Sequence, residues 1–194
     1  MNGRLGEDAP LFDVFLRDGF GSRVEGLAGR LRVAGGGEIR SYRLSDSLAG
    51  LIPGTGQAPF VVFADACLDV GESHLRRLAR LLRHNPGIPA LTFGGEALAR
   101  VYGETAAGGG QVAQRLAPVR HLPSWFCAVS RGLLDKDGFH TPEFFLLDLG
   151  RRLAERGVQP LSLASAPAVL DTRFWVRDLL FQAPDNLATD YRQY

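Results

Sequence analysis

Lysine is almost missing from this sequence. Of the 22 basic residues only Lys136 is a lysine, and the residue after it is Asp137. A P-loop needs a lysine followed by Ser or Thr, and a Schiff base needs a lysine amine. Both mechanisms are therefore effectively excluded.

Cysteine is scarce too, because the chain has only Cys67 and Cys127, far apart and each in an apolar run. They form no CxxC pair, so neither a zinc site nor a redox pair is expected. Residues 1–13 show no signal-peptide pattern, and no apolar run approaches the roughly 18 residues of a membrane span. We therefore expect a cytoplasmic protein with no integral membrane segment.

Net charge is nearly zero, since 22 basic and 21 acidic residues give a formal charge of +1. Such a chain has no overall field to draw it to nucleic acid, so we expect no nucleic-acid partner. Hydrolase and phosphate-loop motifs are missing as well. The four histidines form no HExxH pattern, there is no GxSxG elbow, and no glycine cluster completes GxGxxG.

What remains is an ordinary globular composition over 194 residues, of which 45% are hydrophobic. A chain of this length buries roughly 70% of its unfolded surface and can form a full core without disulfides or metals. We predict a single domain over residues 1–194.

Short apolar runs bounded by glycine, proline or aspartate predict the strands. They are residues 11–16, 38–42, 59–64, 88–93, 125–130, 158–163 and 168–170. The run at 59–64 is continuously apolar, which is typical of a central parallel strand covered on both faces, and it ends at Asp65.

Periodic apolar residues predict helices at residues 22–33, 73–84 and 143–156, with Ser22 and Ser73 as N-caps of the first two. Strands alternating with helices predict an α/β fold with a mainly parallel sheet flanked by helices, whose ligands collect beyond the carboxyl ends of the strands. The inward positions are Val24, Leu27, Leu31 and Val33, then Leu75, Leu78, Leu81 and Leu82, then Phe144, Leu147 and Leu153.

Two ordered blocks of sequence carry a family resemblance. In the first, the apolar strand ends in Asp65-Ala66-Cys67 and a helix runs on to Asn85-Pro86. The second consists of the strand 125–130, Gly138-Phe139, Asp148-Leu149, Arg152-Leu153 and Gly157. In order and in most of their spacing these blocks resemble the family-two glycosyltransferases. The resemblance covers about residues 60–169 and implies a compact fold of the GT-A, nucleotide-diphospho-sugar transferase-like type.

The resemblance implies a nucleotide-sugar donor whose diphosphate is held near Asp65 with the help of Mn²⁺ or Mg²⁺. Asp65 matches the first acid of the family's Asp-x-Asp motif, but Cys67 stands at the second. A thiol is a poor ligand for these hard cations, so weak metal affinity is expected. Asp171 is similar in position to a metal-binding histidine of the family, which makes Asp65 and Asp171 the candidate metal ligands. A surface role for Asp171 is the alternative.

The helix register implied by the resemblance puts Phe145 and Leu146 where the family has a Glu-Asp pair. Neither side chain can take a proton, so the usual catalytic base is missing. Asp148 is the candidate base in its place, and Glu143 is its alternative.

Four further residues are candidate donor contacts through the resemblance. Asp46 matches the acid that holds the uracil or ribose, Trp125 offers a stacking face, and His140 follows the Gly-Phe turn. Arg152 can neutralise phosphate. The structural alternatives are an N-cap for Asp46, a core tryptophan for Trp125, a solvated turn histidine for His140 and a surface ion pair for Arg152.

Two functions follow from these residues. The first is a glycosyltransferase that moves a sugar from a nucleotide-sugar donor to an acceptor. The second is a degenerate GT-A-like domain that keeps the scaffold to bind a ligand or a protein partner, and Cys67, Phe145 and Leu146 favour it. A third interpretation, an unrelated α/β binding domain, predicts a sheet order without the strand switch of the glycosyltransferases.

Overall fold

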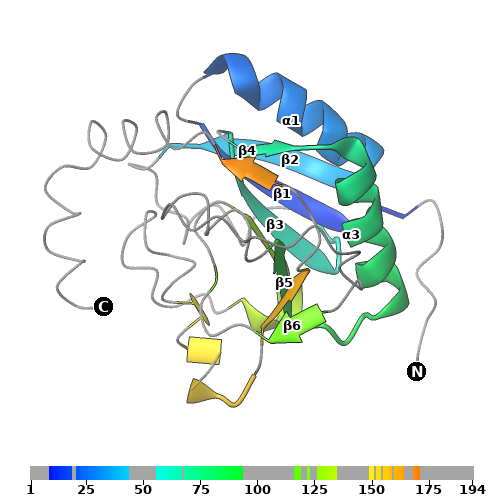
Figure 1. Ribbon diagram of the computed structural model, residues 1–194, viewed down its shortest axis with the longest axis vertical. Helices are drawn as coiled ribbons and strands as arrows, with labels where there is room; N and C mark the ends of the chain where they lie inside the picture. The colour runs from blue at the N-terminus through cyan, green and yellow to red at the C-terminus, as the bar shows by residue number, and fades with distance from the viewer. Residues whose placement is uncertain are drawn as a thin grey trace, which may run out of the picture.

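The computed structural model describes the chain in segments (Figure 1). They are residues 9–18, 21–43, 56–66, 68–93, 116–118, 122, 126–134, 149–150, 152–153, 155–158, 160–163 and 168–170.

The described residues form a mixed α/β fold. Its larger sheet has seven strands in the order β2-β1-β3-β7-β5-β8-β6, and β4 and β9 form a separate two-stranded ladder. The strands are β1 (Phe12–Arg17), β2 (Gly36–Tyr42), β3 (Phe60–Asp65), β4 (Leu68–Val70), β5 (Ala90–Phe93), β6 (Leu116–Pro118), β7 (Phe126–Ser130), β8 (Leu161–Leu163) and β9 (Ala168–Leu170). All seven sequence-predicted strands therefore contain a strand, whereas β4 and β6 were not predicted.

The strands of the larger sheet run in both directions. β1 is parallel to β2 and β3, and β5 is parallel to β8. However, β7 is antiparallel to both of its neighbours, β3 and β5, and β6 is antiparallel to β8. Five of the seven strands therefore run in one direction, as a mainly parallel sheet predicts, while β7 and β6 run in the opposite direction and make the sheet mixed.

The prediction of a buried central strand is confirmed by β3. It lies between β1 and β7, and all six of its residues are buried. Phe60, Val62 and Ala64 join a core on one face of the sheet, while Val61 and Phe63 join a core on the other. Apolar residues therefore cover both faces of this strand, as in a sheet with layers on both sides.

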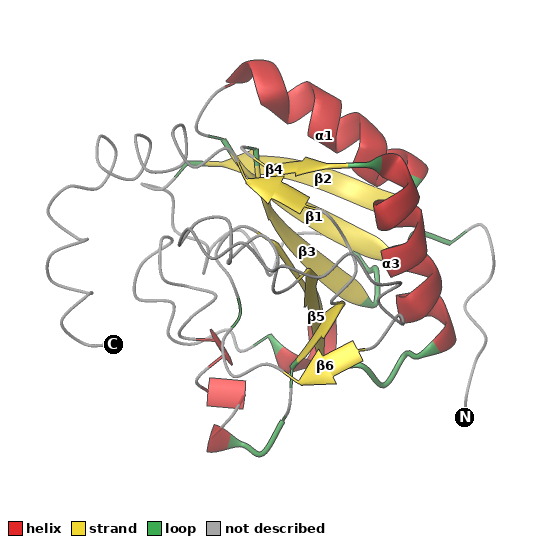
Figure 2. Cartoon of the chain, viewed as in Figure 1, coloured by secondary structure: helices red, strands yellow, loops and turns green. Residues whose placement is uncertain are grey.

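Two helices, α1 (Gly21–Val33) and α3 (Glu72–His84), contribute to the first of these cores and contact each other (Figure 2). In α3 the predicted leucine stripe is confirmed, because Leu75, Leu78 and Leu82 are fully buried. The predicted cap is wrong. The helix begins at Glu72 with Gly71 as its N-cap, so Ser73 lies in the first turn.

In α1, Leu27 and Leu31 are buried as predicted, but Val33 is 56% exposed. Val33 lies two residues beyond Leu31, which turns it about 200° around the helix and away from the sheet. Ser22 lies inside the helix, which starts at Gly21, and so is not its N-cap.

Within the described segments, no helix has both the length and the apolar character that crossing a bilayer requires.

Candidate functional site

The strand order reverses between β1 and β3. From β1 the chain passes through α1 to β2 on one side, whereas from β3 it passes through α3 to β5 on the other side. In open α/β sheets, ligands bind outside the carboxyl ends of the strands at such a point. β1 and β3 are parallel, so both end at the same edge, with Arg17 and Asp65 as their last residues. We call this edge the β1–β3 carboxyl edge.

A buried ion pair joins the last residues of the two strands at this edge. Arg17 is opposite Asp65 in the strand register, and its Nη2 donates a hydrogen bond to Oδ2 of Asp65. The two side chains are only 3% and 2% exposed. A charge this deeply buried is costly without a partner of opposite sign, and here each group neutralises the other.

The ion pair lies on the same face as an aromatic pair from the same two strands. The rings of Phe15 and Phe63 stack with centroids 5.5 Å apart. The backbone continues the ladder past the strand ends, because the N–H of Asp18 donates to the carbonyl of Tyr42 (2.7 Å) and that of Ala66 to the carbonyl of Arg17 (3.1 Å). The edge is therefore fixed both by side-chain packing and by backbone hydrogen bonds.

β4 begins three residues after Asp65 and forms a short antiparallel ladder with β9. Leu68 pairs with Leu170, and Val70 pairs with Ala168. The side chains of Leu68 and Val70 are buried in the same core as the helices. The ladder thus brings the segment after Asp65 together with a segment about a hundred residues later, as the register of Leu68 with Leu170 shows.

Of the residues that the sequence singled out, Asp65 and Arg152 lie within the described segments. Asp65 stands at the end of a buried strand, as predicted, and Arg152 is half-buried beside the buried Leu153. The structure does not describe the other candidate residues, which are Asp46, Cys67, Trp125, His140, Glu143, Asp148 and Asp171. Their assigned roles stay predictions.

The described surroundings of Asp65 do not suit a divalent cation. One carboxylate oxygen is already bound by the Arg17 guanidinium, which is permanently positive. Mg²⁺ and Mn²⁺ prefer several oxygen ligands and would here lie against a cation of the same sign. Within the described segments, no three His, Cys, Asp or Glu side chains are grouped as they would be around a metal ion.

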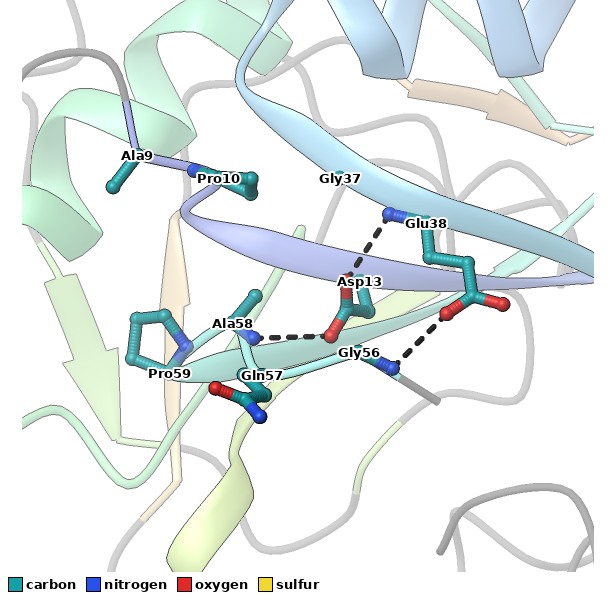
Figure 3. Close-up of a pocket in the computed structure, with 9 residues that line it drawn as sticks. All are labelled: Ala9, Pro10, Asp13, Gly37, Glu38, Gly56, Gln57, Ala58 and Pro59. Atoms are coloured by element: carbon teal, nitrogen blue, oxygen red, sulfur yellow. Dashed lines mark hydrogen bonds between the residues drawn. The ribbon is translucent and has the colours of Figure 1, made fainter. Parts of the chain in front are cut away.

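A second polar cluster lies at the opposite edge, near the amino ends of the same strands (Figure 3). The buried carboxylate of Asp13 accepts the backbone N–H of Glu38 (3.1 Å) and that of Ala58 (3.1 Å), and it forms an ion pair with Arg131. Nε of Arg131 also donates to the carbonyl of Ala58 (2.7 Å). We call these four residues the Asp13 clamp. It joins β1, β2, the entry to β3 and the turn after β7.

A pocket of about 380 Å³ lies beside the Asp13 clamp. Two glycines form part of its wall, and a Cβ on Gly37 would come within 2.8 Å of Pro10 and 2.9 Å of Asp13 Oδ1. Its two carboxylates, those of Asp13 and Glu38, already accept hydrogen bonds from the protein itself. The lining residues, which Figure 3 shows, are Ala9, Pro10, Asp13, Gly37, Glu38, Gly56, Gln57, Ala58 and Pro59.

Glu38 links this edge to the segment before β3. Its carboxylate accepts Nε of Arg40 (2.6 Å) and the backbone N–H of Gly56 (3.0 Å). These two hydrogen bonds, that from Arg40 first, lower the pKa of Glu38. The carboxylate is exposed, so its contribution is screened by solvent.

Sequence reasoning missed Arg17 and Asp13. Both stand in or directly beside the apolar run at residues 11–16, which was predicted to be a strand. A charged residue in a buried strand must find a partner, so its presence there is a signal of a buried ion pair. The signal does not identify the partner, because Asp65 and Arg131 lie 48 and 118 residues away, respectively.

Comparison with known protein families finds no family model that matches the chain, and comparison with curated proteins finds no match either.

Proposed function

We propose that this chain is a glycosyltransferase-like domain of the GT-A type, which binds the nucleoside diphosphate of a nucleotide sugar at the β1–β3 carboxyl edge. One observation carries the proposal. Asp65, the residue that resembles the first acid of Asp-x-Asp, ends a buried central strand where the strand order reverses. An edge of this kind is where open α/β sheets bind their ligands.

The β4–β9 ladder supports the same site. Leu68 and Leu170 are the chain neighbours of Cys67 and Asp171, which the family resemblance places at the diphosphate. The register pairs these two leucines directly. Two segments with candidate ligand-binding residues therefore meet beside the strand that ends in Asp65.

In the transferase form of the proposal, Asp148 accepts the proton of the acceptor hydroxyl as the new glycosidic bond forms. General-base help of this kind is typically worth about 10²–10⁴-fold in rate. The donor loses its nucleoside diphosphate, which leaves from the carboxyl edge.

A second candidate function is binding without transfer. The ion pair of Arg17 and Asp65 favours it, because the carboxylate that resembles the family's metal ligand is already neutralised inside the protein. Phe145 and Leu146, at the positions of the usual base, favour it too. In this form the domain binds a nucleotide or a protein partner and catalyses nothing.

One assay separates the two forms. The purified chain and its Asp148→Asn variant are incubated with a panel of nucleotide sugars, and released nucleoside diphosphate is measured. Turnover that the variant loses supports a transferase. No turnover together with a raised melting temperature in one nucleotide supports a binding domain, because a ligand that binds only the folded state stabilises it. If the chain shows neither turnover nor a raised melting temperature with any nucleotide, the proposal is contradicted.

A further inference from the structure

The strand β2 forms an outer edge of the larger sheet. Within the described residues it is the last strand on its side, and β1 is its only partner. It has seven residues and is the longest of the described strands. An edge strand presents a row of unpaired N–H and C=O groups, which can pair with the backbone of another chain.

Two hydrogen bonds fix which backbone groups of β2 face outward. The N–H of Glu38 turns inward and donates to the carboxylate of Asp13 on β1 (3.1 Å), as Figure 3 shows. The carbonyl of Tyr42 also turns inward and accepts the N–H of the residue that follows β1 (2.7 Å). Successive residues of a strand direct these groups to alternate sides. Ile39 and Ser41 therefore direct their N–H and C=O groups away from β1.

The charged side chains of β2 lie on one face and have opposite signs. Glu38 and Arg40 are 40% and 36% exposed and form an ion pair with each other (2.6 Å). Ile39 lies on the other face, where it packs against the core that α1 and α3 cover. Charges on an edge strand usually discourage pairing with other strands. One glutamate and one arginine, however, are together complementary to a second copy of themselves.

An antiparallel second copy of β2 matches these charges when the two-fold axis passes through Ile39. Glu38 of each copy then lies opposite Arg40 of the other, and opposite charges across two strands attract. If the axis moves by one residue, Glu38 lies opposite Glu38, or Arg40 opposite Arg40. Like charges directly opposite each other are destabilising. The charges therefore select one register.

The same register pairs the outward backbone groups. The N–H and C=O groups of Ile39 meet those of Ile39 in the other copy, as in a hydrogen-bonded pair of an antiparallel ladder. The N–H of Ser41 meets the carbonyl of Gly37. This carbonyl points outward because it lies trans, in the same peptide, to the inward N–H of Glu38. Backbone and side chains thus favour the same pairing.

We propose that β2 pairs with β2 of a second copy of this chain, antiparallel about Ile39, and that the resulting dimer has one continuous sheet. Such an interface is isologous, since both copies contribute the same surface. Pairing along a single strand covers little surface, so the dimer is in a concentration-dependent equilibrium with the monomer. The inference is independent of the proposed function and is tested without nucleotide.

Sedimentation equilibrium of the full chain tests the dimer. The mass of the parent chain should rise from that of a monomer to that of a dimer with concentration. Glu38→Arg and Arg40→Glu each place like charges opposite each other, so each should raise the dissociation constant about tenfold or more. An equimolar mixture of these two variants again places opposite charges at both positions. The mixture should therefore form a heterodimer about as tight as the parent dimer.

Arg76→Glu is the matched control for the charge reversals. It reverses the arginine of another exposed ion pair, with Glu72 on α3, and should leave the dissociation constant unchanged. A backbone variant tests the same edge without changing a charge. Ser41→Pro removes an N–H that faces away from β1, so it should keep the β1–β2 ladder and weaken the dimer. Urea denaturation checks that each variant is folded.

Three results contradict the inference. The first is a parent chain that stays monomeric up to its highest soluble concentration. The second is a dimer that both charge reversals leave intact, because such a dimer forms through another surface. The third is that the two reversed variants, each monomeric alone, stay monomeric when they are mixed.

Discussion

Removing the carboxylate of Asp13 is expected to destabilise the fold strongly. The carboxylate satisfies the N–H groups of Glu38 and Ala58 and neutralises Arg131. In Asp13→Ala these donors lose their acceptor inside the protein. An unsatisfied buried donor costs about 1–3 kcal/mol and a lost charged hydrogen bond a similar amount. Arg131 is 26% exposed and recovers part of its loss from water.

Three such losses amount to at most about 9 kcal/mol. The Glu38 N–H and Arg131 are only partly buried and recover contacts with water, so we expect a loss of about 3–5 kcal/mol in the free energy of unfolding, out of the 5–15 kcal/mol typical of a domain. Urea denaturation followed by circular dichroism measures the loss as a lower midpoint at an unchanged slope. Asp13→Asn keeps one acceptor oxygen and should lie between Asp13→Ala and the parent chain. Glu38→Gln, an exposed neighbour in the same cluster, should barely move the midpoint. The reasoning is refuted if Asp13→Ala proves as stable as Glu38→Gln.

Three other predictions follow from the same region and from the core. The pKa of Glu38 is lowered in the folded chain, so its carboxylate should stabilise the fold fully above its ordinary pKa of 4.5. This stabilisation should be lost as the pH falls through the pKa that Glu38 has in the folded chain. Melting temperatures measured against pH should show this loss in the parent chain and not in Glu38→Gln. Gly56→Ala should destabilise the fold, because a Cβ there would overlap the carboxylate of Asp13, and unfolding in urea at a midpoint equal to that of the parent would count against this. Cys127 is fully buried and its thiol pKa is raised by burial, so mass spectrometry should find it unmodified by iodoacetamide in the native chain and modified in urea.

The parts of the fold that the sequence predicts are those in which local pattern decides the structure. β3 is a continuous apolar run, and α3 has buried leucines at helical spacing, so both could be assigned from a short window. The direction of β7 could not be predicted, since an apolar run is compatible with either direction in a sheet. Its neighbours in the sheet, β3 and β5, end at Asp65 and Phe93, far before β7 begins at Phe126, so no local pattern links their directions.

The candidate site divides in the same way. The sequence places Asp65 at the carboxyl end of a central strand because the apolar run stops there. It does not reveal that Arg17 is its partner, because that depends on the register of β1 against β3. The Asp13 clamp likewise depends on three strands and a turn meeting at one edge, which no local pattern encodes.

The central claim is that ligand binds at the β1–β3 carboxyl edge and not at the pocket beside the Asp13 clamp. Hydrogen–deuterium exchange, measured with and without the nucleoside diphosphate that most raises the melting temperature, compares the two edges in one experiment. We expect nucleotide to slow exchange at the amides of Asp18 and Ala66, at the carboxyl ends of β1 and β3. Slower exchange confined to the amides of Glu38 and Ala58, at the opposite edge, would contradict it.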